Sequence, residues 1–199
     1  MGDDMSHEPP VWVKLRERDS HDHHIFKVRT IDVADPRNGQ EYVRTVLDAA
    51  DWVNVVAVTT DQSVVLVRQF RFGIWANTLE IPGGMVDGTE APATAAAREL
   101  EEETGFRPET VRLLGVSPPN PAIQGNRLHS YLALGCTRVN SGKPDTSEDL
   151  RVELVPRASV KDLVLSGQIT HSLVLATLLF EAWQGELHRS RAKRVGEVG

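Results

Sequence analysis

The chain has little of several features that would place a protein in a class at once. It holds one cysteine, Cys136, among 199 residues, so it forms no internal disulfide and no thiolate zinc cluster. That cysteine usage is typical of a reducing compartment. No apolar run reaches the roughly 18 residues that a membrane helix needs. The polar start, MGDDMSHEPP, does not resemble a secretion signal. We therefore expect a cytoplasmic protein with no membrane partner.

Basic residues are also in deficit. Lys and Arg number 22 against 28 Asp and Glu, which gives a formal net charge of −6. Proteins that hold a long nucleic-acid backbone need a basic surface, so no nucleic-acid partner is expected. The hydrophobic share of 40% and the charged share of 25% are those of an ordinary globular chain. This balance excludes a disordered, collagen-like or coiled-coil protein.

Most of the predicted elements are strands. Alternating or β-branched residues predict strands at 11–15, 25–32, 41–47, 52–59, 63–69, 78–81, 111–116, 128–134 and 151–155. A helix is predicted over 93–103, after Pro92 and before a capping Gly105. A second helix is predicted over 172–187, and the capping-box pattern of Ser159 and Asp162 predicts a helix start. The fold class is a mixed α/β sandwich rather than an alternating βαβ array.

Composition also suggests how the chain is divided. Residues 1–10 and 188–199 lack apolar periodicity, so we expect flexible tails there. Residues 11–47 form an N-terminal β segment that precedes the main domain, which we place at 48–187. The apolar faces of those early strands must be buried against something, because exposed strand edges are a liability.

Three glutamates carry the strongest chemical signal. Glu99, Glu102 and Glu103 stand at i, i+3 and i+4, which places them on one face of the predicted helix. Like charges at this spacing repel, and the C-terminal end of a helix disfavours anions. A solvated helix gains nothing from the arrangement, whereas carboxylate oxygens are the ligands that Mg²⁺ and Mn²⁺ prefer. A charged solvent-exposed face is the alternative for these three residues taken alone.

The surrounding residues complete a longer motif. Gly84, Glu90, the run Arg98-Glu99-Leu100, the pair Glu102-Glu103 and the pair Gly105-Phe106 stand at the spacing of the Nudix box. The chain therefore resembles the Nudix hydrolases, which cleave a nucleoside diphosphate linked to another moiety. The resemblance implies the αβα sandwich of that family, with a mixed central sheet. It also implies Mg²⁺ ligands among Glu99, Glu102 and Glu103, a further ligand in the Gly83 carbonyl, and a structural ion pair between Glu90 and Arg98.

Residues outside the box indicate a branch of the family. The segments VRQFR at 67–71 and LEIPGG at 79–84 are similar to those of the ADP-ribose and nucleoside-diphosphate-sugar pyrophosphatases. A proline at about the position of Pro121 is typical of ADP-ribose pyrophosphatases. Its loop, 117–129, is predicted to bind substrate, with a surface turn as the alternative. Predicted substrate-binding residues are Arg71, Glu80, Pro121 and Arg127.

The general base is sought in the acidic loop that follows the sheet. In the branch that this chain resembles, such a loop supplies a carboxylate near the attacked phosphorus. The matching segment here is 145–152, where Glu148 is the first choice and Asp145 and Asp149 are alternatives. Glu102 is a further catalytic candidate. A solvated acidic loop is the alternative interpretation of the segment.

The sequence thus predicts a Mg²⁺-dependent enzyme, with Mn²⁺ as a possible substitute, that hydrolyses nucleoside diphosphate sugars such as ADP-ribose, GDP-mannose and UDP- or ADP-glucose. The alternatives are a dedicated ADP-ribose pyrophosphatase and a Nudix-fold ligand sensor without catalysis. The resemblance also implies a homodimer, in which N-terminal strands cross a two-fold interface and residues near Trp12 reach the partner's site.

Overall fold

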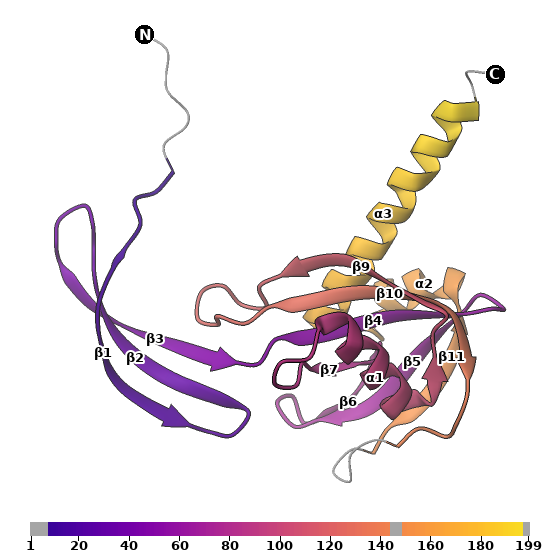
Figure 1. The fold of residues 1–199 in the computed structure, drawn as a ribbon, viewed down its shortest axis with the longest axis horizontal. Coiled ribbons are helices and arrows are strands. Elements are labelled where there is room, and N and C mark those ends of the chain that lie inside the picture. The colour runs from indigo at the N-terminus through magenta and orange to yellow at the C-terminus, as the bar shows by residue number, and fades with distance from the viewer. Residues whose placement is uncertain (1–7, 144–148, 197–199) are drawn as a thin grey trace. The chain divides into compact units, whose positions relative to one another are not determined.

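A computed structural model describes residues 8–143 and 149–196 of the chain. Two compact units are present (Figure 1). The first unit holds the chain up to Ala50 together with Asn120–Asn126. The second unit holds Asp51–Pro119 and the chain from Arg127 onward.

The first unit is a three-stranded antiparallel sheet in the order β1-β2-β3. Its strands are β1 (Val13–Asp22), β2 (Phe26–Ala34) and β3 (Glu41–Ala49), all longer than the sequence predicts at one end or both. The segment 120–126 belongs to this unit because the Leu47 amide donates to the Ile123 carbonyl at 2.7 Å. The loop that carries Pro121 is therefore divided between the two units.

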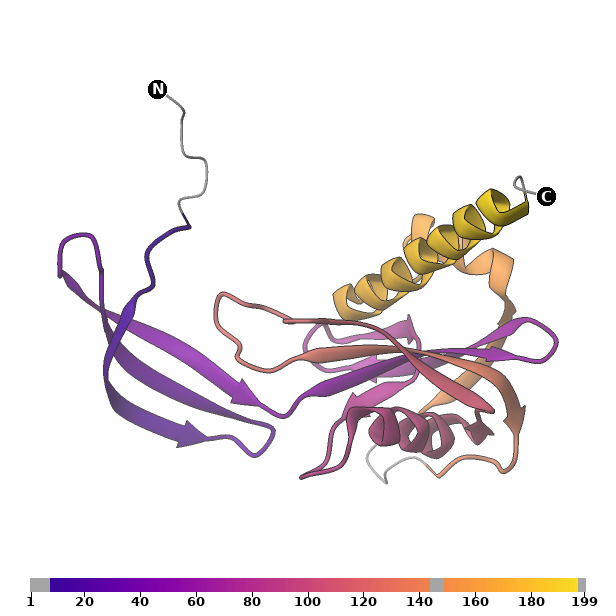
Figure 2. The ribbon, with the colours of Figure 1, turned by 45° about the horizontal axis from the view of Figure 1, so that its top comes forward.

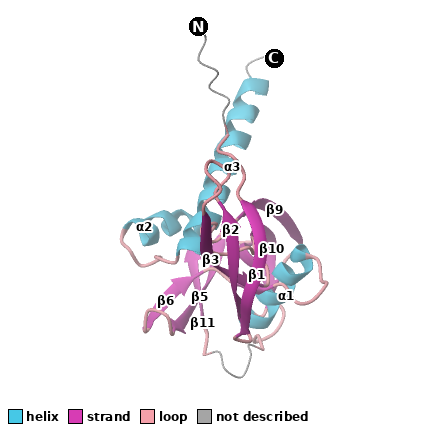
Figure 3. Ribbon diagram, turned by 90° about the vertical axis from the view of Figure 1, so that its left-hand side faces the viewer, coloured by secondary structure: helices cyan, strands magenta, loops and turns pink. Residues whose placement is uncertain are grey.

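The second unit is built on an eight-stranded mixed sheet. Its central order is β11-β5-β4-β10-β8, with β6 beside β5, β7 beside β4 and β9 beside β10. The strands are β4 (Trp52–Thr59), β5 (Ser63–Arg71), β6 (Ala76–Glu80), β7 (Gly83–Met85), β8 (Phe106–Arg107), β9 (Thr110–Ser117), β10 (Leu128–Arg138) and β11 (Arg151–Pro156). Helix α1 (Pro92–Thr104) covers one face, and α2 (Val160–Leu165) and α3 (Ser172–Gly196) cover the other (Figures 2 and 3). This is the mixed α/β sandwich that the sequence predicts.

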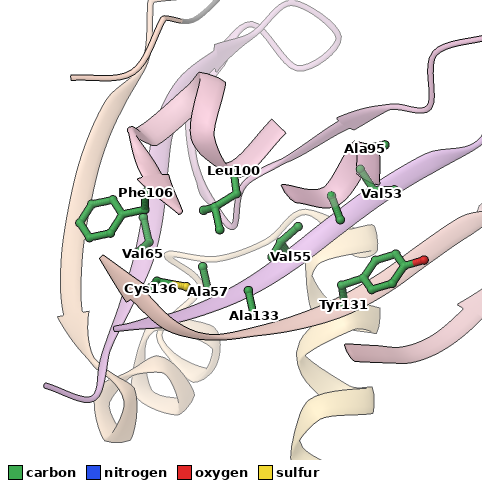
Figure 4. Close-up of a cluster of buried hydrophobic side chains, with 11 residues drawn as sticks. Val53, Val55, Ala57, Val65, Ala95, Leu100, Phe106, Tyr131, Ala133 and Cys136 are labelled. Atoms are coloured by element: carbon green, nitrogen blue, oxygen red, sulfur yellow. The ribbon is translucent and has the colours of Figure 1, made fainter. Parts of the chain in front are cut away.

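Alternation along β4 explains why both faces need helices. Val53, Val55 and Ala57 pack with Leu100 of α1 in one buried cluster (Figure 4). Val56 and Val58 point the other way, into a cluster that includes residues of α2 and α3. Burial of one such side chain stabilises the fold by roughly 1.5–3 kcal/mol. A strand with both faces buried must read as a continuous apolar run, as WVNVVAVT nearly does.

Helix α1 begins and ends where its sequence requires. Pro92 occupies the first turn, where its missing N–H removes no hydrogen bond. Gly105 ends the helix in the left-handed region, at φ 75°, and its amide donates to the Glu101 carbonyl at 2.8 Å. A side chain at Gly105 would also collide with the Asn140 carbonyl. Both ends therefore fix the register of the glutamates along the helix.

One predicted boundary is wrong. The backbone of α3 is helical to Gly196, past the predicted end at 187 and through most of the predicted tail. The helix start predicted from Ser159 and Asp162 is confirmed, because α2 begins at Val160, but Ser159 makes no side-chain cap hydrogen bond: its backbone is already helical in a 3₁₀ turn (Arg157–Ser159) that leads directly into α2. No helix within the described parts of the chain is both long and apolar enough to cross a membrane.

Candidate active site

A cavity of about 610 Å³ lies within the second unit. It opens where strands β4 and β5 diverge: the two pair only at Ala57–Val65 and Val58–Val64. Beyond that point β7 pairs with β4 and β6 pairs with β5. Residues of β4, β5, β7, α1 and the start of α3 line the cavity. The divergence of two central strands thus creates the space in which polar side chains from several elements meet.

The α1 wall of the cavity carries the three predicted glutamates. Glu99, Glu102 and Glu103 all line it. Glu103 is 5% exposed and accepts a hydrogen bond from the Gly83 amide at 3.1 Å. A Cβ built on Gly84 would lie 2.5 Å and 2.6 Å from the two carboxylate oxygens of Glu99. Only glycine at 84 lets β7 approach this carboxylate so closely.

Arg98 forms ion pairs with several glutamates of this wall. Its Nη2 lies 2.7 Å from Glu90 Oε1, which is the ion pair that the resemblance implies. Its Nη1 lies 3.0 Å from Glu99 and 2.9 Å from Glu102, two contacts that the sequence does not predict. The hydrogen bond to Glu90 is the main reason why the pKa of Arg98 is raised, and the same bond lowers the pKa of Glu90. One guanidinium therefore offsets the repulsion among three carboxylates.

The donor chemistry of this wall fits a hard divalent cation. Three carboxylates line one cavity beside the backbone of Gly83 and Gly84, and oxygen donors suit Mg²⁺ or Mn²⁺. Within the described residues, however, no group of three acidic, histidine or cysteine side chains is already arranged around a common point. The reason is visible in the contacts: Arg98 engages Glu99 and Glu102, and Gly83 engages Glu103. The glutamates must rotate to act together.

An arginine from the central sheet also lines the cavity. Arg71 of β5 makes two hydrogen bonds to Glu80, at 2.8 Å and 2.7 Å. Glu80 is 2% exposed and also accepts from Thr78 at 2.5 Å. Burial alone would raise the pKa of Glu80, but the contacts from Arg71, His171 and Thr78 outweigh burial and hold that pKa well below its usual range. Glu80 is therefore ionised and holds Arg71 in place.

The other predicted site residues lie elsewhere. Glu80 anchors Arg71 from behind and is not among the residues that line the cavity. Pro121 is exposed and belongs to the first unit. Arg127 is exposed on the second unit and does not line the cavity, as is true of Asp149. Asp145 and Glu148 lie outside the described residues, so their positions are not compared with the prediction.

Several lining residues were given no role from the sequence, and the polar ones include Asn54, Gln69 and His171. Asn54 and Gln69, each 8% exposed, lie on β4 and β5, and His171 stands immediately before α3. A polar residue inside an otherwise apolar strand, as in WVNVV, is a signal that could have singled out Asn54. His171 gives no such signal, because only the tertiary fold brings the start of α3 to the cavity.

Comparison with known proteins agrees with this geometry. The NUDIX domain model matches residues 50–178. The chain is 34% identical over 164 residues to the CMP-5'-(N-acetyl-N-hydroxy-3-aminopropyl)phosphonate hydrolase of Streptomyces rubellomurinus, covering 81% of this chain and 77% of that protein. It is 30% identical to the ADP-ribose pyrophosphatase of Mycobacterium tuberculosis, covering 78% and 75%.

A solved structure extends the likeness to the fold. The crystal structure of an ADP compounds hydrolase superposes with a TM-score of 0.78 at 22% identity, covering 91% of this chain and 98% of that one. The carboxylate-bearing helix, its glycine-rich approach strand and the sheet that carries them all fall within the region matched by the domain model. On these grounds the chain belongs to the Nudix family.

Proposed function

We propose that the chain is a Mg²⁺-dependent pyrophosphohydrolase that converts a nucleoside diphosphate sugar into a nucleoside monophosphate and a sugar phosphate. The observation that carries the proposal is the cavity itself, which Glu99, Glu102 and Glu103 line together with Arg71. Such a site suits a ligand with several negative charges. The relatives named above support the same class, since one is named a CMP-phosphonate hydrolase and the other an ADP-ribose pyrophosphatase.

Nudix hydrolases generally use divalent metal cations. In this chain Glu99, Glu102, Glu103 and the Gly83 carbonyl would hold Mg²⁺, with Mn²⁺ as a substitute. When bound, such a cation offsets the charge of the pyrophosphate and lowers the pKa of a water molecule. Arg98 must then release Glu99 and Glu102 while it keeps Glu90, its shortest contact.

The remaining roles fall to the chain's own side chains. Arg71, fixed by two bonds to Glu80, donates to a phosphate oxygen. A carboxylate takes one proton from the attacking water; Glu148 is the first choice, then Asp145 or Asp149, and Glu102 is the candidate on the α1 wall. The water oxygen bonds to phosphorus, the bond from that phosphorus to the bridging oxygen breaks, and the leaving phosphate keeps the electron pair.

A substrate panel tests the proposal. ADP-ribose, GDP-mannose and UDP-glucose would be incubated with the protein and Mg²⁺ or Mn²⁺, and the products identified by ³¹P NMR. The expected products are a nucleoside monophosphate and a sugar phosphate, and chelation of the metal should stop their formation. Absence of hydrolysis for every compound and both metals would contradict the proposal and favour a ligand sensor.

A dedicated ADP-ribose pyrophosphatase is the second candidate. The likeness to the enzyme of that name in Mycobacterium tuberculosis favours it. The same panel separates the two candidates through kcat/KM. A preference for ADP-ribose of a hundredfold or more, about 2.7 kcal/mol in transition-state binding, indicates the dedicated enzyme, whereas values within tenfold indicate the broader one.

We also propose a homodimer that the first unit helps to form. Its sheet exposes Trp12, Val13, Leu15 and Val43 by 40%, 51%, 45% and 46% of their surfaces. Trp12 packs edge-on against Tyr42, with the Arg44 guanidinium over both rings. Tyr42 and Val43 are consecutive in β3 and face opposite sides of the sheet, so each face of the first unit carries exposed apolar side chains for a second copy of the chain to cover. Sedimentation at micromolar concentration should give twice the 22.0 kDa mass of one chain, and a fully active monomer would exclude the dimer.

A further inference from the structure

The buried carboxylate of Glu80 is approached by donors from three side chains. Its Oε1 atom lies 2.8 Å from Arg71 Nε and 2.5 Å from the Thr78 hydroxyl. Its Oε2 atom lies 2.7 Å from Arg71 Nη2 and 3.2 Å from His171 Nδ1. These contacts outweigh burial and keep the carboxyl ionised, with a pKa well below its usual range. Arg71 and His171, which both line the cavity, therefore converge on one negatively charged oxygen atom.

The contact with Glu80 determines which nitrogen of His171 carries a proton. An ionised carboxylate only accepts hydrogen bonds, so a lone pair on Nδ1 would face a negative oxygen at 3.2 Å. The proton of the ring therefore belongs on Nδ1, although the approach is not aligned for a full hydrogen bond. In a neutral imidazole the other nitrogen, Nε2, is then an acceptor.

The cavity receives the opposite edge of the same ring. The side chain of His171 is 37% exposed, whereas its Nδ1 atom is buried. The exposed part of the ring consequently lies away from Glu80. Because an imidazole has only two nitrogens, Nε2 is the only polar atom of this side chain that can contact a ligand in the cavity. The residue thus supplies the cavity with an acceptor that a carboxylate orients from behind.

We propose that His171 is a substrate-binding residue whose Nε2 atom accepts a hydrogen bond from a hydroxyl group of the sugar esterified to the phosphate that Arg71 holds. The inference rests on the proposed function and deepens it, because it names a specificity contact of the same site. The ionised diphosphate of a nucleotide sugar offers only acceptors, and the attached sugars supply hydroxyl donors beside it. Arg71 donates and His171 accepts, so one buried glutamate sets two complementary contacts next to each other.

Nitrogen NMR of the histidine rings tests the tautomer without turnover. At about pH 8, where an ordinary histidine is neutral, His171 should show a protonated Nδ1 and an unprotonated Nε2, and His171→Gln identifies these signals by their loss. His129 is the internal control, because its Nε2 lies 2.9 Å from Asp51 Oδ2 and should carry the proton instead. A His171 ring protonated at Nε2, as in His129, would overturn the inference.

Ligand titrations then identify the group that His171 contacts. At least one of ADP-ribose, GDP-mannose and UDP-glucose, added without divalent metal, should shift the His171 Nε2 signal saturably, because a hydroxyl donates to that nitrogen. Inorganic pyrophosphate has phosphoryl groups but no sugar hydroxyl, and should leave that signal in place over the same concentrations. An equal shift with pyrophosphate would assign His171 to a phosphoryl group, and no shift with any compound would remove it from the substrate. Either result would overturn the inference.

Two variants at position 171 separate substrate contact from mere support of Glu80. An asparagine amide reaches the place of Nδ1, which faces Glu80, whereas a glutamine amide reaches that of Nε2. If Nε2 binds substrate, His171→Asn should raise KM roughly tenfold and His171→Gln only about threefold, with smaller changes in kcat. If the ring only supports Glu80, the order of the two variants reverses, and that result would contradict the inference. Thermal unfolding of both variants checks the fold.

Turnover distinguishes this inference from the proposed function. Hydrolysis of nucleotide sugars with equal KM in the two variants would refute the contact and leave the pyrophosphohydrolase standing. A saturable shift of His171 Nε2 by a nucleotide sugar, in a protein that hydrolyses none of them with Mg²⁺ or Mn²⁺, would do the reverse.

Discussion

The α1 wall of the cavity and the surroundings of Arg71 differ in how carboxylates and arginines are arranged. On the α1 wall, carboxylates crowd together and a single arginine, Arg98, holds them in check. Glu80 does not line the cavity; it is buried, accepts two hydrogen bonds from Arg71 and lies against Thr78 and His171. A glutamate that lines the cavity can reach a ligand directly, whereas Glu80 can act on one through Arg71. Residue type alone does not tell these two positions apart.

Removing one carboxylate from the α1 wall should have the largest effect. Glu99→Gln or Glu103→Gln should lower kcat on the order of a hundredfold or more, because an amide is a weaker ligand for a hard cation. Steady-state kinetics in saturating Mg²⁺ measure the effect, and circular dichroism checks the fold. Glu109→Gln, at an exposed position that does not line the cavity, is the matched control. Near-full activity in either variant would refute the metal assignment.

The reaction should also need a carboxylate outside the α1 wall, in the acidic loop that follows the sheet. Glu148→Gln should lower kcat by about 10²–10⁴ and remove the acidic limb of the pH–rate profile, as expected for a general base. Asp145→Asn and Asp149→Asn should be milder. If all three variants keep both the rate and the limb, the base lies on the α1 wall itself, and Glu102→Gln would then be the variant to measure.

Replacing Glu80 should change the stability of the protein rather than its binding of a metal ion. Glu80→Gln should destabilise the protein by about 2–3 kcal/mol, since it replaces the buried carboxylate that accepts two hydrogen bonds from Arg71 by a neutral amide. The pKa of Glu80 lies below its ordinary value of 4.5 in the folded protein. Its stabilising contribution is therefore complete above pH 4.5 and declines as the pH falls below 4.5. Thermal unfolding should show a gap between the two proteins at pH 7 that narrows below pH 4.5. A constant gap would contradict this role.

The smallest expected effect concerns the close approach of β7 to α1. Gly84→Ala should lower kcat/KM roughly tenfold, about 1.4 kcal/mol, because the added methyl displaces the Glu99 carboxylate. Gly73→Ala is the control, since a Cβ there meets nothing within 4 Å. An alanine at 84 that proves as harmless as one at 73 would mean that the position of Glu99 does not limit the reaction.

Local rules account for much of the fold. Strand β4 follows from its β-branched run, and α1 follows from Pro92, a series of strong helix formers and Gly105. The same rules also predict the helix start at Ser159, although the backbone there is already helical and the Ser159 side chain makes no cap hydrogen bond. They also place the end of α3 too early, because the polar residues after 187 lack apolar periodicity yet continue the helix.

The candidate site likewise has a part that the sequence predicts and a part that only the tertiary fold brings together. The Nudix spacing puts Arg98, Glu99, Glu102 and Glu103 near one another on α1, since residues three and four apart on a helix are neighbours, and Glu90 reaches Arg98 from the loop before the helix. Asn54 and His171 lie 117 positions apart in the sequence, and both line the cavity only because α3 packs on β4. Sequence periodicity does not predict that residues so far apart line the same cavity. Glu80 illustrates the same limit, because Glu80 and Glu103 are both buried and only the tertiary fold brings Glu103 and not Glu80 to the cavity lining.

The contacts of Arg98 also determine what a metal ion encounters on arrival. The carboxylates already have an internal counterion, so cation binding is an exchange of partners rather than the neutralisation of a bare anionic surface. Part of the free energy of coordination is spent in releasing the guanidinium. The apparent affinity is therefore a difference between two ionic contacts, weaker than three glutamates alone would give.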